Sequence, residues 1–198
     1  MANTVVTVTP SKTVLSPGEN FTVMVSVEPA SGVNVAGTQF DLAFNPEAMK
    51  VNSVAQGTLF GSNESFFMQG TIEPTAGTLK NVALVILGAG QSVSTPGSIA
   101  VLSCTAVTGG KTSLLVLSNV IVANKDAVAL PLESIVTTQI QVASVWDLNL
   151  DGSIDIADLM VVVAAFGMVG VPGWKREDLN ADGVVNVLDM VAEAQKFD

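Results

Sequence analysis

The chain has 198 residues and a formal net charge of −10 at pH 7, so there is room for one domain of ordinary size and a second, small one. Residues 147–198 carry ten acidic and three basic side chains, and this acidity argues against nucleic acid or an anionic membrane as a partner. No apolar stretch reaches the roughly 18 residues that a membrane-spanning helix needs.

Residues 1–143 carry the pattern of an all-β domain. Runs of alternating or β-branched residues recur at short spacing, and turn sequences such as Ser16-Pro17-Gly18 and Thr95-Pro96-Gly97 separate them. Because no long helical pattern interrupts these runs, they predict a β-sandwich or jelly roll. The nine predicted strands are residues 4–9, 21–28, 38–44, 51–55, 65–72, 78–87, 98–107, 112–122 and 134–142.

An ordered series of strand–turn segments runs through this region: Val8-Thr9-Pro10, SPGENFTV at 16–23, GTQFDLAFNP at 37–46, GTLF at 57–60, PGSIA at 96–100 and GKTSL at 110–114. In this order the segments resemble cohesin domains. No single segment is decisive, because carbohydrate-binding sandwiches share part of these strand–turn patterns, but together they cover nearly all of residues 1–143. The resemblance implies a nine-stranded jelly-roll sandwich that binds a dockerin on one flat sheet face.

The cohesin resemblance also implies where that binding face lies. The face would be built from residues 37–45, 65–73, 78–87 and 112–122, with Gly37, Gln39 and Asp41 among its outward residues. Strand alternation agrees, since Phe40, Leu42 and Phe44 would then point into the core. Gln39 stands where the family often has Asp, so we expect a different hydrogen-bond network. Ordinary solvated strand residues are the alternative reading of Gln39 and Asp41.

Two acidic loops repeat in register near the C-terminus, at residues 147–158 (loop 1) and 178–189 (loop 2). Oxygen-bearing side chains at loop positions 1, 3, 5, 9 and 12, with Gly at position 6, match what Ca²⁺ requires, and position 7 adds a backbone carbonyl. The alternative is a pair of solvated acidic turns without metal. The predicted ligands of two calcium ions are Asp147, Asn149, Asp151, Ser153, Asp155 and Asp158 in loop 1, and Asp178, Asn180, Asp182, Val184, Asn186 and Asp189 in loop 2.

These loops depart from the usual EF-hand in two ways. Position 12 is Asp rather than a bidentate Glu, and the segments before the loops, 141–146 and 169–173, do not form an entering helix. Each unit is therefore a loop with an exiting helix, a pattern that resembles the dockerin domain. We accordingly predict a small α module at residues 144–198 of two EF-hand-like repeats, with metal binding supplying much of its folding free energy.

The dockerin resemblance implies that helix residues from loop positions 10 and 11 contact the partner. These are Ile156 and Ala157 in the first repeat and Val187 and Leu188 in the second, all apolar, which favours a hydrophobic interface. Core packing competes with this interpretation. Helical spacing predicts that Leu159, Met160, Val163 and Phe166 bury between the two repeats, with Leu188, Met190, Val191 and Phe197 doing so in part.

Few residues suit catalysis. The chain has no His, no Tyr, no Gly-x-Ser-x-Gly motif and no phosphate-binding glycine loop. A glycosidase needs two carboxylates that converge on a cleft, and only Glu64 and Glu73 lie on adjoining segments of the sandwich, with no sign of an acid–base pair. A carbohydrate-binding surface usually offers a strip of Trp or Tyr, and residues 1–143 contain neither.

We therefore interpret the chain as a non-catalytic adaptor for calcium-dependent cohesin–dockerin assembly, in extracellular or cell-surface polysaccharide-degrading complexes. A carbohydrate-binding sandwich that carries a dockerin is the alternative. The predicted partners are a dockerin-bearing protein on the sandwich face and a cohesin-bearing protein on the C-terminal module. If that module binds the sandwich of a second copy, the head-to-tail contact would generate open chains of molecules.

Two smaller features complete the sequence. The first residues, Met1-Ala2-Asn3-Thr4, lack the basic and long apolar segments of a signal peptide, so secretion would depend on a signal outside this sequence. The single cysteine, Cys104, lies in an apolar run and cannot form an internal disulfide, so we expect a buried structural thiol.

Overall fold

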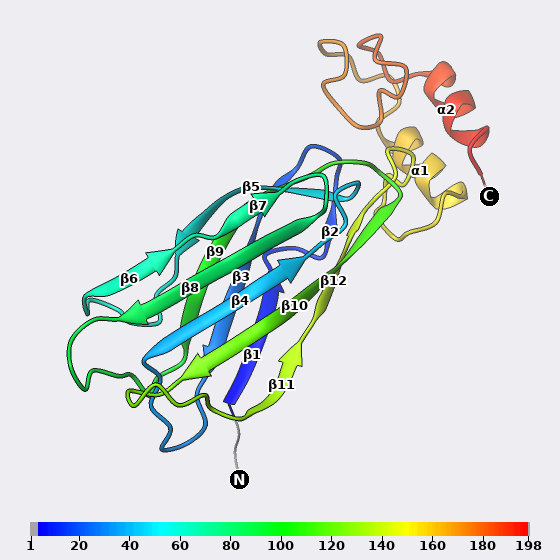
Figure 1. The fold of residues 1–198 in the computed structure, drawn as a ribbon. Coiled ribbons are helices and arrows are strands. Elements are labelled where there is room, and N and C mark those ends of the chain that lie inside the picture. Colours follow the sequence, from blue (N-terminus) through cyan, green and yellow to red (C-terminus); the bar gives the residue numbers. More distant parts are fainter. Residues whose placement is uncertain (1–3, 198) are drawn as a thin grey trace.

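A computed structural model describes residues 4–197 as a β-sandwich followed by two short helices (Figure 1). The first sheet runs β11-β1-β3-β9-β5, and the second runs β2-β12-β10-β4-β8-β6, with β7 paired to β8. The strands are β1 (Thr4–Pro10), β2 (Val14–Leu15), β3 (Asn20–Glu28), β4 (Gly37–Ala43), β5 (Met49–Gln56), β6 (Ser65–Met68), β7 (Thr71–Glu73), β8 (Thr78–Ile86), β9 (Gly97–Ala106), β10 (Lys111–Ala123), β11 (Leu132–Val136) and β12 (Thr138–Val142), and the helices are α1 (Ile156–Ala164) and α2 (Val187–Ala194).

Strict alternation of apolar and polar residues produces the two-layer core. In β3, Phe21, Val23 and Val25 are buried, and the residues between them lie toward solvent. The predicted inward set of the third run is confirmed, since Phe40, Leu42 and Phe44 are all buried. Inward side chains of both sheets meet in one apolar cluster, as face-to-face packing of two sheets requires.

Cys104 of β9 belongs to this cluster and is fully buried, as expected. Burial raises the pKa of its thiol to about 12, because the thiolate would have to form away from water. The thiol is therefore neutral and unreactive in the folded protein.

The predicted sandwich is confirmed, but the predicted number of strands is wrong: the described residues form twelve strands, not nine. Residues 65–72 divide into β6 and β7 at Gly70, where φ is +75° and a Cβ would lie 2.4 Å from the Lys80 carbonyl oxygen. Residues 134–142 divide at Thr137, because β11 pairs with β1 in one sheet while β12 pairs with β10 in the other. The third addition, β2, is only two residues long, too short for any periodicity to reveal.

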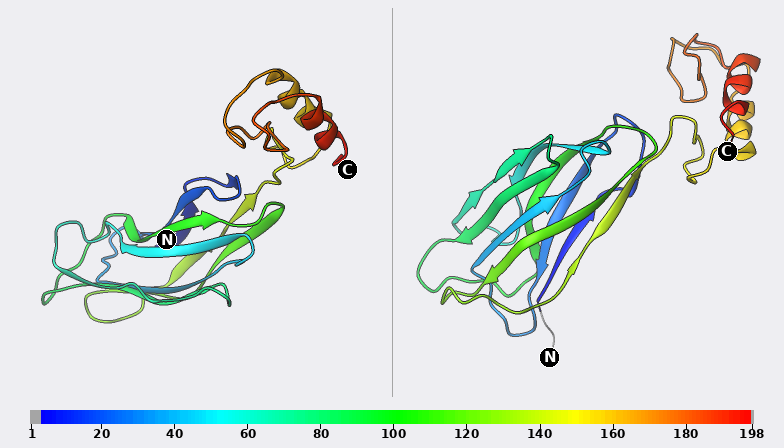
Figure 2. Two further views of the ribbon diagram at one scale, coloured as in Figure 1. Left: turned by 90° about the horizontal axis from the view of Figure 1, so that it is seen from above. Right: turned by 45° about the vertical axis from the view of Figure 1, so that its right-hand side comes forward.

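The C-terminal module lies beyond one end of the sandwich, on the side where β12 ends (Figure 2). Its two helices pack against each other and away from the sheets. They share a small core of Leu148, Val162, Ala165 and Val185, flanked by Val161, Leu179 and Met190. Neither helix is long and apolar enough to cross a membrane, and the rest of the described chain offers no other candidate.

Candidate functional site: two acidic loops and a sheet face

Loop 1 and loop 2 adopt the same fold and share most of their hydrogen bonds. At position 1, one oxygen of Asp147 accepts from the N–H of Asp151 at 3.1 Å and the other accepts from the N–H of Gly152 at 3.1 Å. Asp178 accepts the equivalent bonds from Asp182 and Gly183, both at 3.0 Å. The repeat seen in the sequence is thus a repeat in three dimensions.

The carboxylate at position 12 ties the start of each loop to its end. One oxygen of Asp158 accepts from the N–H groups of Leu148 and Asn149, at 2.7 and 3.0 Å, and the other accepts from the N–H of Asp155 at 3.0 Å. Asp189 accepts the same three bonds at 2.8, 3.2 and 2.8 Å, from Leu179, Asn180 and Asn186. Each position-12 side chain therefore closes its loop.

Positions 9 and 12 also start the helices. Asp155 caps α1 by accepting from the N–H of Ala157 at 2.7 Å, and Asn186 caps α2 by accepting from the N–H of Leu188 at 2.8 Å. Together with the position-12 side chains they form a reciprocal capping box at each helix start. The same residues thus shape the loop and fix where the helix begins.

The backbone of each loop reverses sharply at the predicted glycine. Gly152 and Gly183 have φ values of +96° and +91°, a conformation that side chains other than glycine's rarely adopt. Position 4 is also left-handed in both loops, at Leu150 (φ +65°) and Ala181 (φ +54°). A non-glycine residue with positive φ is uncommon, so its recurrence at equivalent positions marks a conformation imposed by the loop.

Four loop carboxylates are buried without a cationic partner. Asp147, Asp158, Asp178 and Asp189 are at most 4% exposed, and no ion pair found among residues 4–197 includes them. The side-chain atoms that a metal ion could bind here are all oxygens, the ligand type that suits Ca²⁺. Each carboxylate oxygen that accepts one N–H keeps a further lone pair for such an ion. Within the described chain, however, no three Asp, Glu, His or Cys side chains converge closely enough to hold a metal by themselves.

A fifth acidic residue, which sequence reasoning missed, joins loop 1. Glu193 of α2 is fully buried, and neither of its carboxylate oxygens has a hydrogen-bond partner in the described structure. Burial and, to a smaller extent, the nearby negative charges of Asp158 and Asp147 together raise its pKa to about 7. The last turn of α2 thus lies against the first turn of α1, which makes the helices antiparallel. The sequence signal that could have revealed Glu193 is that Val162 occupies the equivalent position of the first repeat.

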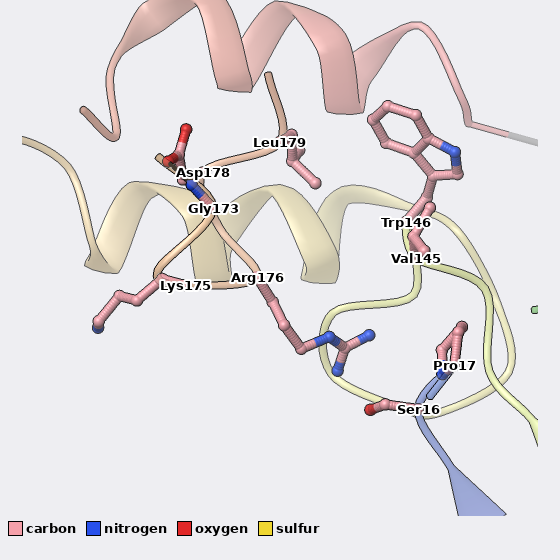
Figure 3. Close-up of a pocket in the computed structure, with 9 residues that line it drawn as sticks. All are labelled: Ser16, Pro17, Val145, Trp146, Gly173, Lys175, Arg176, Asp178 and Leu179. Carbon is pink, nitrogen blue, oxygen red and sulfur yellow. Dashed lines mark hydrogen bonds between the residues drawn. The ribbon is translucent and has the colours of Figure 1, made fainter. Parts of the chain in front are cut away.

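Arg176, which precedes loop 2, binds the backbone at the start of the module and of loop 1. Its guanidinium donates to the backbone carbonyl oxygens of Asp147, Ser144 and Leu148, at 2.8, 3.4 and 3.5 Å. Figure 3 shows this side chain reaching toward Ser16 and Pro17, at the edge of an open pocket of about 380 Å³ between the sandwich and the module. Sequence reasoning missed Arg176 as well, because its acceptors are backbone atoms about 30 residues away.

The predicted packing of the helices is wrong in part. Leu159 and Met190 are half-buried, but Met160, Val163, Phe166, Leu188 and Val191 are exposed. The helices have only nine and eight residues, and α1 and its C-cap contribute Val162 and Ala165 to the small core instead, with Met190 of α2 packed against them. The predicted contact residues are exposed too: Ile156 is 61% and Val187 and Leu188 are each 57% accessible, and Ala157 is also open to solvent.

On the sandwich, the predicted face is the outer side of the sheet that contains β4. Asp41 accepts from the backbone N–H of Asn81 at 2.7 Å and from the side-chain amide of Asn119 at 2.6 Å. Gln39 donates to the Asn119 carbonyl oxygen at 3.5 Å. Gly37 lies outside this cluster, beside Val85. Both asparagines have positive φ and stand where the pairing of β8 and β10 with β4 shifts register, so Asp41 bridges two bulges.

Large apolar side chains surround this polar centre. Cross-strand pairing places Phe66 opposite Val85 and Ile121 opposite Gln39. These residues all point away from the core, so they form one surface rather than scattered exposures. The exposed apolar set on this face is Phe66, Met68, Val85, Leu114, Val116 and Ile121.

Comparison with known proteins gives a consistent fold. A module from a Clostridium perfringens family 33 glycoside hydrolase, described as a cohesin, has 16% sequence identity, a TM-score of 0.57, and covers 73% of this chain and 99% of its own. A type II cohesin domain from the cellulosome of Acetivibrio cellulolyticus has 14% identity and a TM-score of 0.58, covering 70% and 95%.

A chain of a type I cohesin–dockerin complex from Clostridium thermocellum has 13% identity and a TM-score of 0.58, covering 73% of this chain and 96% of its own. No curated protein sequence matches the chain significantly. The family model for the cohesin domain matches residues 5–142, which is well over half of the chain. The chain belongs to the cohesin domain family.

Proposed function

We propose that the chain is a non-catalytic adaptor with two binding modules. The cohesin domain, residues 1–143, would receive a dockerin-bearing protein, and the C-terminal module, residues 144–198, would act as a calcium-dependent, dockerin-like plug for a cohesin-bearing protein. Two solved relatives give this setting: one is a type II cohesin of a cellulosome and one comes from a cohesin–dockerin complex. Extracellular or cell-surface complexes that degrade polysaccharides are the proposed context.

The single observation that carries the proposal is the duplicated loop–helix unit. The two loops share most of their hydrogen bonds, their glycine turns and their capping boxes, and each delivers an exposed apolar pair at its helix start. A solvated acidic turn has no need for four buried carboxylates without cations, whereas a calcium ion would neutralise them. The predicted ligands therefore remain the proposed ones, six from each loop.

Calcium, when bound, would supply charge neutralisation and additional bonds that hold each loop against its helix. The chain's own contribution is orientation: Asp147 and Asp178 already turn their carboxylates into the loops through bonds to backbone N–H groups. Because loop 1 offers four carboxylates and loop 2 offers three, we expect loop 1 to bind calcium more tightly.

The sheet face of the sandwich supports the other half of the proposal, the binding of a protein partner by the cohesin domain. Its apolar rim and its hydrogen-bonded centre of Gln39, Asp41 and Asn119 match the mixture of apolar contact and fixed polar groups found at protein interfaces. It has no Trp or Tyr on which a sugar ring could stack. A protein partner is therefore favoured over a polysaccharide.

Two titrations of the full-length chain test the proposal. Isothermal titration with Ca²⁺ should give two sites, and a stoichiometry of zero or one would contradict the paired loops. A second series should then measure binding to a panel of purified dockerins and cohesins, each with Ca²⁺ and with chelator. Retention on a soluble or insoluble glucan, without binding to any protein in the panel, would establish the carbohydrate-binding alternative instead.

A further inference from the structure

Glu193 stands out as a buried charge without compensation. It is fully buried, both carboxylate oxygens lack a partner in the described structure, and its charged neighbours, Asp158 and Asp147, have its own sign. The nearby cations are engaged elsewhere: the Lys196 ammonium lies 5.0 Å from the centre of the Trp146 ring, and Arg176 binds backbone carbonyls. A buried carboxylate in such surroundings is strongly destabilising unless a cation joins it.

The internal repeat shows that this position does not require an acid. Glu193 is position 16 of the second repeat, and position 16 of the first repeat is Val162, which is also fully buried. A valine therefore satisfies the packing role of this position. Packing alone therefore does not account for the carboxylate, and the charged groups nearest to it, Asp158 and Asp147, belong to the loop of the other repeat.

We propose that Glu193 is a ligand of the calcium site in loop 1, supplied across the repeats by α2. This inference rests on the proposed calcium binding and names a ligand that the 12-residue loop pattern does not contain. Calcium accepts six to eight oxygens, so a loop-1 site has room for a further carboxylate. Asp158 is one methylene shorter than the usual position-12 Glu, and Glu193 provides a longer carboxylate from outside the loop.

A structural consequence follows from this assignment. Calcium in loop 1 would bind the last turn of α2 as well as the first turn of α1, and so would clamp the two repeats together. Calcium in loop 2 would have no such reach, because Val162 holds the equivalent position. Loading loop 1 should therefore order the helix pair, while loading loop 2 should act mainly on its own loop.

The test is calcium titration of the full-length chain with two variants of Glu193. E193Q keeps the shape and removes the charge, and E193V copies the residue of the other repeat. Each should weaken one of the two calcium sites by at least about tenfold and leave the other unchanged. E177Q, which removes the same charge from the same module just before loop 2, is the matched control and should leave the loop-1 site unchanged.

Two backgrounds assign the affected site. In D182A, where loop 2 is disabled, E193V should weaken the remaining calcium binding; in D151A, where loop 1 is disabled, it should not. Unchanged affinity in D182A overturns the inference while leaving calcium binding intact. If the wild-type chain binds no calcium at all, the proposed function fails with it, and the silent wild-type titration identifies that case.

Thermal unfolding provides a readout that does not depend on fitting binding curves. In chelator, E193V should unfold at a higher temperature than the wild type, because it removes an uncompensated buried carboxylate. With saturating Ca²⁺ that advantage should shrink or reverse, because the variant has lost a ligand. An equal gain in chelator and in calcium would mean that Glu193 is only a poorly tolerated core residue, and would overturn the assignment.

Discussion

The sandwich and the C-terminal module solve the problem of stability in opposite ways. Thirty-one buried residues join the core cluster of the sandwich, whereas four form that of the module, among the residues that the structure describes. The module instead buries five acidic side chains, four of which accept hydrogen bonds from backbone N–H groups and none of which has a cationic partner among the ion pairs of the described residues. The sandwich therefore has an extensive apolar core of its own, whereas under the proposed function the module would draw much of its stability from bound calcium.

Removal of calcium should produce the largest difference between the two regions. In chelator, the buried carboxylates of both loops would repel each other without compensation, so residues 147–197 should lose protection from hydrogen exchange while β3 and β9 keep theirs. Hydrogen exchange of the full-length chain with and without Ca²⁺ measures both regions at once. Equal loss of protection in the two regions would show that the sandwich shares the dependence on metal.

A cavity in the sandwich should have the complementary effect. Phe40 is fully buried in β4, so F40A should cost about 3–5 kcal/mol of the sandwich's unfolding free energy. The calcium stoichiometry should not change, because the loops do not contact this core. Chemical denaturation of F40A, with M24A at an exposed strand position as the control, provides the measurement. A fall in calcium binding by F40A would mean that the two regions fold as one.

Partner binding sharpens the comparison further, because the module is built from two repeats. The two apolar pairs lie at the starts of antiparallel helices, so a half-turn of the module would exchange Ile156-Ala157 with Val187-Leu188. I156D alone should then cost little, since the molecule can bind through the other helix. Adding L188D should weaken binding by about 2 kcal/mol or more, because a charge is buried in either orientation.

The measurement is the affinity of a cohesin partner for each single variant and for the double variant, in saturating Ca²⁺. If I156D or L188D alone abolishes binding as completely as the double variant does, only that helix forms the interface. The repeats are not identical at these positions, since Leu188 is bulkier than Ala157. A moderate preference for one orientation is therefore compatible with the two-way mode.

The sequence was informative wherever a local pattern determines a local structure. Alternation located every long strand, and the spacing of oxygen-bearing residues located two loops whose glycines do turn with positive φ. Features that depend on which strands pair or which helix faces meet were missed. The break at Thr137 arises because β11 and β12 pair with different sheets, and the exposure of Met160 and Phe166 depends on which side of a short helix meets its neighbour.

In the candidate site, too, local patterns were predicted and contacts between distant segments were not. The resemblances placed Gln39 and Asp41 on a surface, but the bulges that Asp41 bridges depend on Asn81 and Asn119, which come from two other strands. Arg176 donates to, and Glu193 lies near, residues of the first repeat that are 28 to 46 positions away in the sequence. Internal comparison of the repeats is the one sequence signal that could have singled out Glu193, since its counterpart is Val162.

The smallest effect concerns the buried thiol of the sandwich. Burial raises the pKa of Cys104 from its ordinary value of 9.0 to about 12, so the native state keeps the thiol protonated while the unfolded chain ionises. A raised native pKa means that this contribution to stability is intact below pH 9 and is lost progressively as the pH rises toward 12. At about pH 10 the loss should be ~1.4 kcal/mol.

C104V removes the thiol, so the difference in unfolding free energy between wild type and C104V should shift by this amount between neutral pH and pH ~10. Other groups also titrate in this range, but they contribute equally to both proteins and cancel in the difference. Parallel pH profiles for the two proteins would show that the thiol is not sealed from solvent, and would weaken the picture of a sandwich whose stability depends on its own packing alone.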